Sequence, residues 1–166
     1  MDKTKFWTNL KSGEFASMVK ESSYGETASS PKEIFNIMKP LFAEKDDVEV
    51  MYCLFFNAKN KILAIEKMFS GSINSSAVYP REIIKKSLEL KATCLVMVHN
   101  HPSGNTNPSR EDYAITAKVF VALESISMSL HDHIIIGENF FSLAEHGYLE
   151  SIKLNTQKFY RTVQCM

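Results

Sequence analysis

The sequence lacks a long hydrophobic run and has few cysteines. No stretch approaches the roughly 20 apolar residues that a helix needs to cross a bilayer, and the N-terminal segment MDKTKFWTNLKSGEF has no apolar signal-peptide core. The three cysteines, Cys53, Cys94 and Cys165, are odd in number, far apart and without a C-x-x-C pair. This spacing indicates neither a disulfide framework nor a cysteine zinc knuckle. We therefore expect a soluble cytoplasmic protein in which Cys53 and Cys94 are buried, reduced thiols.

The sequence also lacks a net charge. Its 19 basic residues balance 19 acidic ones, so no overall field attracts nucleic acid or anionic lipid. Residues 151–166 carry three basic side chains and no acid, but charged chain ends are usually solvated, and we interpret this segment as a tail. The charge balance thus gives no support to nucleic acid as a partner, although it does not exclude one. No membrane partner is expected, and the oligomeric state stays open.

What the sequence does contain is the pattern of a single α/β domain. It has 166 residues, 45% of them hydrophobic, which is enough to bury a core. Strand-like apolar stretches alternate with stretches of helical spacing. Strands are predicted at 48–56, 61–69, 93–98, 129–136 and 140–143, with a short one around Phe15–Lys20, and helices from Ser30, Pro80 and Ser109. We expect a mixed central β-sheet flanked by helices over residues 29–150, an N-terminal arm over 1–28 and a C-terminal tail over 151–166.

Two histidines end the predicted strand 93–98. Strand side chains alternate between faces, so His99 and His101 project to the same side. Zinc accepts imidazole nitrogen at about 2.0–2.1 Å, and catalytic zinc sites typically use three protein ligands and a water. Asp112 is the best third ligand, because the Gly/Pro-rich loop lets the next helix begin close to the strand end, where its N-terminus favours a carboxylate.

Each part of this motif also has a purely structural interpretation. His-x-His at a strand end is not specific for metal, and Ser109 with Asp112 forms an S-x-x-D pair typical of a helix N-cap. The joint spacing is more specific than any part: His-x-His, a Gly/Pro/Asn-rich loop and then Ser-x-x-Asp. It predicts a zinc site formed by His99, His101 and Asp112.

The segments HNHPSG and PSRED resemble the zinc motif of the JAB/MPN metallopeptidases, the JAMM motif, and are most similar to its bacterial RadC-like branch. The segments FFNAKNKILAIEKMF and HDHIIIGENFFSLAEHG agree with that branch, so the resemblance covers about residues 48–149. It implies a cytidine deaminase-like α/β architecture and a zinc-dependent peptidase or isopeptidase that acts on a peptide or an isopeptide-linked protein. It also implies that His99, His101 and Asp112 bind Zn²⁺ and that Ser109 holds the catalytic water or the oxyanion.

The resemblance further implies a general acid/base glutamate on an upstream strand, and Glu66 is the best match. Its strand face also carries Ile62, Ala64 and Met68, so desolvation is expected to raise the pKa of Glu66 toward the operating pH. The structural alternative is a strand-end glutamate that reaches solvent, since Lys67 beside it shows that charge is tolerated there.

Two further features accompany the motif. Asp132 and His133 match the usual Asp-His pair of the RadC-like branch and are expected to form a buried polar pair behind the site, whereas His131 is expected to be exposed. A second metal site at this pair is not expected, because no third ligand follows at a useful spacing. Ser103 is expected to cap the loop.

Three other functions compete with the hydrolase. A DNA-repair role is suggested by the RadC-like resemblance, but full-length relatives carry a helix-hairpin-helix-like segment before the JAB domain, and the N-terminal arm here is expected to be too short for one. An inert MPN-type scaffold is disfavoured because such relatives lose zinc ligands that this sequence keeps. A nucleobase deaminase requires H-x-E and P-C-x-x-C, and the sequence has neither.

Overall fold

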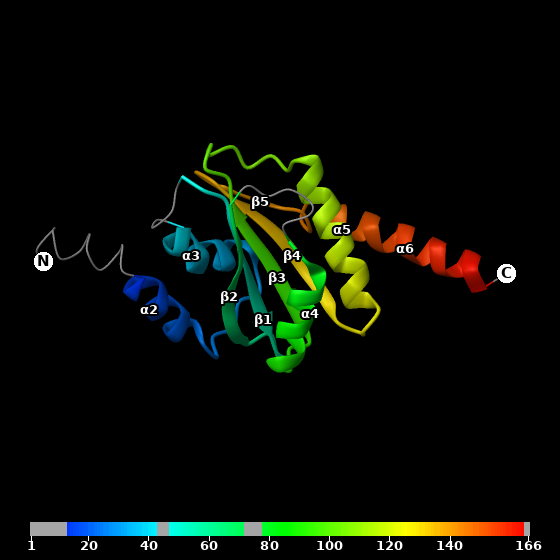
Figure 1. Cartoon of the computed structure of the whole chain (residues 1–166), viewed down its shortest axis with the longest axis horizontal. Helices are drawn as coiled ribbons and strands as arrows, with labels where there is room; N and C mark the ends of the chain where they lie inside the picture. The colour runs from blue at the N-terminus through cyan, green and yellow to red at the C-terminus, as the bar shows by residue number, and fades with distance from the viewer. Residues whose placement is uncertain (1–12, 43–46, 72–77, 165–166) are drawn as a thin grey trace, which may run out of the picture.

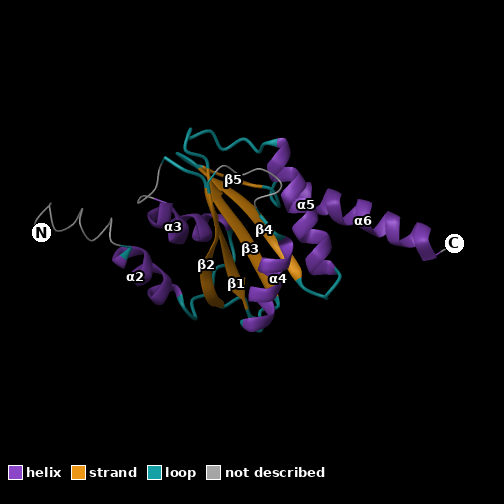
Figure 2. Ribbon diagram, in the orientation of Figure 1, coloured by secondary structure: helices purple, strands orange, loops and turns teal. Residues whose placement is uncertain are grey.

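The computed structural model describes residues 13–42, 47–71 and 78–164, which form one α/β domain with a five-stranded mixed sheet between helices (Figure 1 and Figure 2). The strands are β1 (Val50–Phe56), β2 (Ile62–Ser70), β3 (Cys94–Asn100), β4 (Ser129–Ile136) and β5 (Phe140–Ser142). The helices of this part are α2 (Glu14–Ser23), α3 (Pro31–Phe42), α4 (Pro80–Glu89), α5 (Arg110–Glu124) and α6 (Tyr148–Gln164). The predicted fold class is confirmed.

The strand order is β2-β1-β3-β4-β5. β1 pairs antiparallel with both β2 and β3, β3 pairs parallel with β4, and β5 is antiparallel to β4. A parallel pair requires a crossover connection, which here contains α5. β3 is the central strand in this order, and its C-terminal end leads through one loop into α5.

The sheet is covered on both faces, which explains why β1 and β3 are almost continuously apolar. One face packs against α3 in a cluster that includes Phe35 and Leu54. The other face packs against α4 and α5 in a cluster that includes Met97, Ile83 and Ile115. In Figure 1, α3 lies on one side of the sheet and α4 and α5 lie on the other.

The predicted short strand around Phe15–Lys20 is wrong, because these residues belong to helix α2. Ala16 and Val19 pack against the cluster on the α3 face, whereas Met18 is 61% exposed. Inward residues three positions apart fit a helix and not the alternation of a strand. Residues 1–12 of the predicted arm lie outside the described part of the chain.

The segment predicted as a C-terminal tail continues a helix as far as Gln164. α6 starts against the domain, where Leu149 is buried and Ile152 packs on the α5 side of the core. It then runs away from the sheet (Figure 1), and Leu154 is 48% exposed. Within the described residues, no helix is long and apolar enough to cross a membrane.

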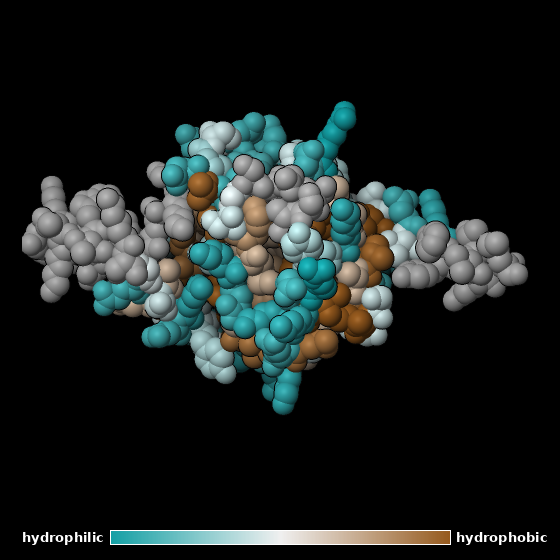
Figure 3. All heavy atoms as spheres, in the orientation of Figure 1, coloured by the Kyte–Doolittle hydropathy of each residue, from teal (hydrophilic) through white to brown (hydrophobic). Residues whose placement is uncertain are grey.

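The cysteines and the exposed apolar residues have structural explanations. Cys53 and Cys94 are free and buried, as predicted, and burial raises the pKa of the Cys53 thiol, which makes it unreactive. In the view of Figure 3, hydrophobic areas reach the surface between hydrophilic ones, as is usual because apolar atoms contribute much of the surface of a folded domain.

Gly137 allows two segments at one end of the sheet to touch. A Cβ atom at this position would overlap the carbonyl oxygen of Gly104 and lie 3.0 Å from Cγ2 of Thr106. Gly104 belongs to the loop after His101, and the backbone N–H of His101 donates to the Ile136 carbonyl at 2.9 Å. Gly137 thus fixes the loop of the histidine motif against the end of β4.

Gly137→Ala should lower the free energy of unfolding by about 1–3 kcal/mol, because the methyl group overpacks a backbone contact. It should also move the loop that carries His101. Gly25→Ala is the control: Gly25 has φ +78 with open space around it, so that variant adds backbone strain alone. Denaturant unfolding and the NMR resonances of His101 measure the two effects. Unchanged His101 resonances in Gly137→Ala would contradict the proposed contact.

Candidate metal centre

The end of β3 presents its two histidines to the α5 side of the sheet. His99 is fully buried, and Asn100 points to the opposite face. The Asn100 side chain accepts a hydrogen bond from the Val50 N–H at 2.7 Å and donates to the Val48 carbonyl at 3.0 Å. These bonds fasten the end of β3 to the start of β1 and hold the alternation that the sequence predicted.

The loop after β3 orients His101. Its Nδ1 lies 2.6 Å from the carbonyl oxygen of Asn105. Because a carbonyl only accepts, this contact assigns the proton to Nδ1, and in the neutral ring Nε2 is then an acceptor. Ser103 Oγ accepts a hydrogen bond from the Asn105 N–H at 3.4 Å, so it caps the loop as expected.

The start of α5 delivers Asp112 through a complete capping box. Ser109 is the N-cap: its Oγ accepts from the Asp112 N–H at 3.1 Å, while Asp112 Oδ2 accepts from the Ser109 N–H at 2.8 Å. The Ser109 hydroxyl also donates to Asp112 Oδ2 at 2.7 Å. The structural interpretation of this pair is therefore confirmed, and the same bonds aim the carboxylate at the histidines.

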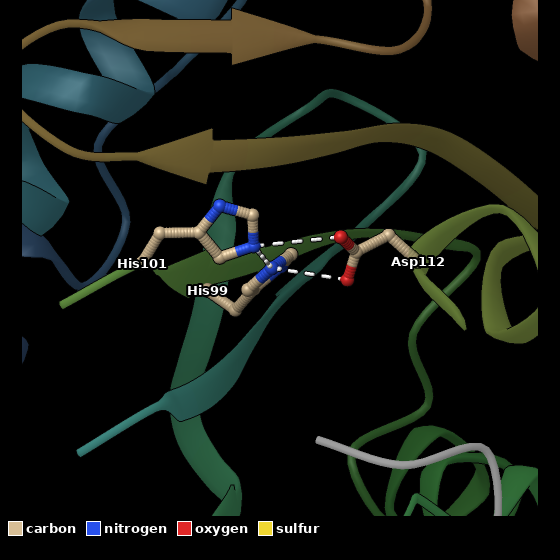
Figure 4. A group of neighbouring side chains, drawn as sticks. All are labelled: His99, His101 and Asp112. Atoms are coloured by element: carbon tan, nitrogen blue, oxygen red, sulfur yellow. Dashed lines mark hydrogen bonds and ion pairs between the residues drawn. The ribbon is translucent and has the colours of Figure 1, made fainter. Parts of the chain in front are cut away.

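His99, His101 and Asp112 converge on one point (Figure 4). The Nε2 atoms of the two histidines are 3.0 Å apart, His99 Nε2 is 3.1 Å from Asp112 Oδ1, and His101 Nε2 is 3.4 Å from Asp112 Oδ2. One ligand atom from each residue lies within 4.8 Å of the others, which makes the three a group that could hold a metal ion. The structure thus brings together the three residues that the motif selected.

The charges of the group are coupled. Burial would raise the pKa of Asp112, but hydrogen bonds from His101 and His99 outweigh it and hold that pKa well below its usual value. The hydrogen bond to Asp112 raises the pKa of His101 despite partial burial, and the nearby charge of Glu49 adds to this effect. Without an ion, Asp112 is a carboxylate, and His101 keeps its proton to a higher pH than an ordinary histidine.

A buried polar layer lies behind the site, as the sequence predicted. His133 Nε2 is 2.8 Å from His99 Nδ1, and His133 Nδ1 is 2.6 Å from Thr116 Oγ1. Burial lowers the pKa of His133 well below its usual value, which keeps the ring neutral. Asp132 is also buried and accepts hydrogen bonds from its neighbours, including Ser142 Oγ at 2.6 Å. His131 is exposed, as expected.

Glu66 lies away from this group. Its register partner is Cys53 of β1, which pairs in turn with Met97, two positions before His99. The Glu66 side chain is 37% exposed, and its carboxylate lies 3.3 Å from the Lys86 ammonium of α4. The carboxylate therefore has a cation beside it instead of the expected apolar neighbours. Glu66 lies on β2, which β1 separates from β3, and its register position is that of Met97 and not of His99.

The sequence reasoning missed Glu49. Met51 of β1 pairs with His99, and Glu49 and His101 are each two positions further toward the same end of the sheet. The antiparallel alternation therefore places half-buried Glu49 on the side of His101. The charge of Glu49 contributes to the raised pKa of His101, which agrees with that position. A Glu-x-Met alternation at the start of β1 was the available signal, but it gains meaning only once β1 is known to pair with β3.

Most of this sequence is similar to that of known proteins. The RadC-like JAB domain family matches residues 28–148. A UPF0758 protein of Thiobacillus denitrificans is 35% identical over 133 residues, which cover 80% of this chain and 59% of the relative. A UPF0758 protein of Photobacterium profundum is 40% identical over 126 residues, which cover 75% of this chain and 56% of the relative. The chain thus spans little more than half the length of these curated relatives.

A mixed five-stranded sheet between helices, with a His/His/Asp group at the end of the central strand, is consistent with the JAB/MPN fold. Within that class, the chain belongs to the RadC-like JAB domain family, because the match extends from residue 28 to residue 148. The resemblance that the HNHPSG and PSRED segments indicated is therefore confirmed.

Binding of Zn²⁺ to this group should weaken as the pH falls. Below the raised pKa of His101, the ion must displace the proton of this histidine, so the affinity should fall by up to about tenfold per pH unit. Chelator competition between about pH 6 and about pH 8 measures the slope. Calorimetry in two buffers of different ionisation enthalpy counts the released protons. Equal affinity at both ends of this range, with no proton release, would contradict the assigned protonation of His101.

Proposed function

We propose that this domain is a zinc-dependent metallopeptidase or isopeptidase-type hydrolase that cleaves an amide bond in a peptide or an isopeptide-linked protein. The observation that carries the proposal is the convergence of two imidazole nitrogens and a carboxylate at the C-terminal end of the central strand β3. A site with three protein ligands leaves a position for a water or a substrate oxygen, as in catalytic zinc sites.

The spacing of the three side chains supports zinc as the ion. Two ligands that each lie about 2.0–2.1 Å from a tetrahedral zinc are about 3.3 Å apart. The three distances within the group are 3.0, 3.1 and 3.4 Å. A set of two imidazoles and one carboxylate suits zinc chemically as well, whereas Mg²⁺ and Ca²⁺ favour all-oxygen sites.

A bound zinc ion would supply Lewis acidity to a water molecule and to the substrate carbonyl. The chain's own residues would then hold the geometry. Asn105 and Ser109 fix two of the three ligands through the hydrogen bonds to His101 and Asp112. Such outer bonds keep ligand side chains in one rotamer and limit reorganisation during the reaction.

Glu49 is better placed than Glu66 to move the proton. A general base must come within hydrogen-bond reach of the water or of the leaving amine. Glu49 lies beside His101 by register and by its electrostatic effect, whereas Glu66 pairs with Lys86 at the level of Met97. We therefore propose Glu49 as the general acid/base and keep Glu66 as the alternative.

Ser109 has two roles that compete for one proton. Its hydroxyl donates to Asp112 Oδ2 in the structure, and a hydroxyl has only one proton to donate. Stabilising an oxyanion would require that the hydroxyl turn away from Asp112 during the reaction. We propose that Ser109 orients Asp112 in the resting site and donates to the oxyanion only after this rotation.

Protein purified without added metal should contain close to one zinc per chain by elemental analysis. His101→Ala and Asp112→Ala should lose most of it, because each removes one of three protein ligands. His131→Ala is the matched control, since His131 is an exposed histidine outside the group. Circular dichroism verifies folding. A well-folded wild type that holds no zinc and takes up none on addition would overturn the hydrolase proposal.

Glu49→Gln should lower the turnover number about 10²- to 10⁴-fold at saturating Zn²⁺, because it removes a proton-transfer group and keeps the shape. Glu66→Gln should leave the turnover number nearly unchanged. Rates are measured on a substrate found by screening fluorogenic peptides and isopeptide-linked conjugates. If Glu66→Gln abolished turnover and Glu49→Gln kept it, the general acid/base would be Glu66 instead.

A further inference from the structure

A continuous chain of buried contacts runs from His99 into helix α5. His99 Nδ1 lies 2.8 Å from His133 Nε2, His133 Nδ1 lies 2.6 Å from Thr116 Oγ1, and Thr116 Oγ1 lies 2.5 Å from the Asp112 carbonyl. The side chains of His99, His133 and Thr116 are fully buried. Asp112 also contacts His99 through its carboxylate, so the four residues close a ring that links β3, β4 and α5.

Counting protons fixes the direction of every bond in this chain. The Asp112 carbonyl can only accept, so Thr116 must donate its one hydroxyl proton there. The Thr116 oxygen then accepts from His133, which places the His133 proton on Nδ1. In a neutral ring, His133 Nε2 is consequently an acceptor, so His99 must donate from Nδ1. In a neutral His99 ring, Nε2, the atom that faces His101 and Asp112, then keeps the lone pair that a metal ion can bind.

The opposite arrangement is disfavoured by the short contact at Thr116. If Thr116 donated to His133, two acceptor oxygens would face each other at 2.5 Å without a proton between them. His133 would then carry its proton on Nε2 and donate it to His99 Nδ1. Neutral His99 would in turn hold its proton on Nε2, the atom 3.1 Å from Asp112 Oδ1, where it would block a metal ion.

We propose that Thr116, acting through His133, sets the tautomer of His99 and thereby prepares Nε2 to bind the metal. Thr116 and His133 are positioning residues, since neither belongs to the His/His/Asp group. This inference rests on the metal-binding part of the proposed function. It adds that the helix which supplies the carboxylate ligand also determines, through its next turn, the proton position on a ligand from β3.

Thr116→Val tests the proposal, because valine keeps the size of the side chain and removes the hydroxyl. Zn²⁺ affinity, measured by chelator competition, should fall about 10- to 100-fold, as is usual when a group behind a metal ligand is lost. Thr116→Ser restores the hydroxyl and should bind as the wild type does. Thr156→Val is the matched control: its hydroxyl makes the same bond to the carbonyl four residues earlier, at 2.9 Å, on α6.

A spectroscopic measurement separates the tautomer from a general loss of packing. Long-range ¹H–¹⁵N NMR distinguishes histidines protonated at Nδ1 from those protonated at Nε2. In the wild type, His133 should be protonated at Nδ1 with and without Zn²⁺, and His99 should be protonated at Nδ1 in the Zn²⁺-bound form. In metal-free Thr116→Val, a fraction of His133 should move to the Nε2–H form. Thr116→Ser should keep the wild-type pattern.

The outcomes distinguish a failure of this inference from a failure of the proposed hydrolase function. No Zn²⁺ binding by the wild type would overturn both. Wild-type binding together with Thr116→Val affinity within a factor of about three of it would overturn this inference and leave the hydrolase standing. His133 protonated at Nε2 in the metal-free wild type would also overturn it, whatever the affinity of the variants.

Discussion

The contact between the Asp112 carboxylate and two imidazoles is the interaction on which the site end of the domain depends. A buried carboxylate is costly unless it is paired and hydrogen-bonded. Asp112 is only 1% exposed, and its oxygens are met by His99, His101 and the N-cap Ser109. The end of β3, the loop after it and the first turn of α5 must therefore all be in place at once for the charge to be compensated.

This requirement explains why the motif can be both a helix cap and a candidate metal site. The S-x-x-D pair caps α5, and the same hydrogen bonds hold the Asp112 carboxylate toward β3. The parallel pairing of β3 and β4 needs the α5 crossover, and that crossover brings the N-terminus of the helix back to the strand end. Close contact between Gly137 and Gly104 holds the intervening loop against β4. Topology thus supplies what the spacing of the motif only indicated.

The sequence predicted those features that depend on residues close together along the chain. The five strands of the sheet, the cap at Ser109 and the group of His99, His101 and Asp112 follow from alternation, capping and the length of one loop. The choice between Glu49 and Glu66 does not, because Glu49 directly precedes β1, Glu66 lies on the neighbouring strand β2, and only the pairing of β1 with β3 separates them. Helix α2 was missed because a short segment with two inward residues carries too little periodicity to distinguish a helix from a strand.

Charge suggests a second role for Glu49 besides the proposed proton transfer. Without an ion, protonated His101 and ionised Asp112 form a neutral pair, and a divalent ion that displaces one proton adds one positive charge to a largely buried site. The Glu49 charge acts on His101 and would offset part of that added charge, and electrostatic effects are strengthened where water is excluded. Removing the charge of Glu49 should therefore weaken metal binding as well as the proposed proton transfer, and only rates measured with the metal site saturated separate the two effects.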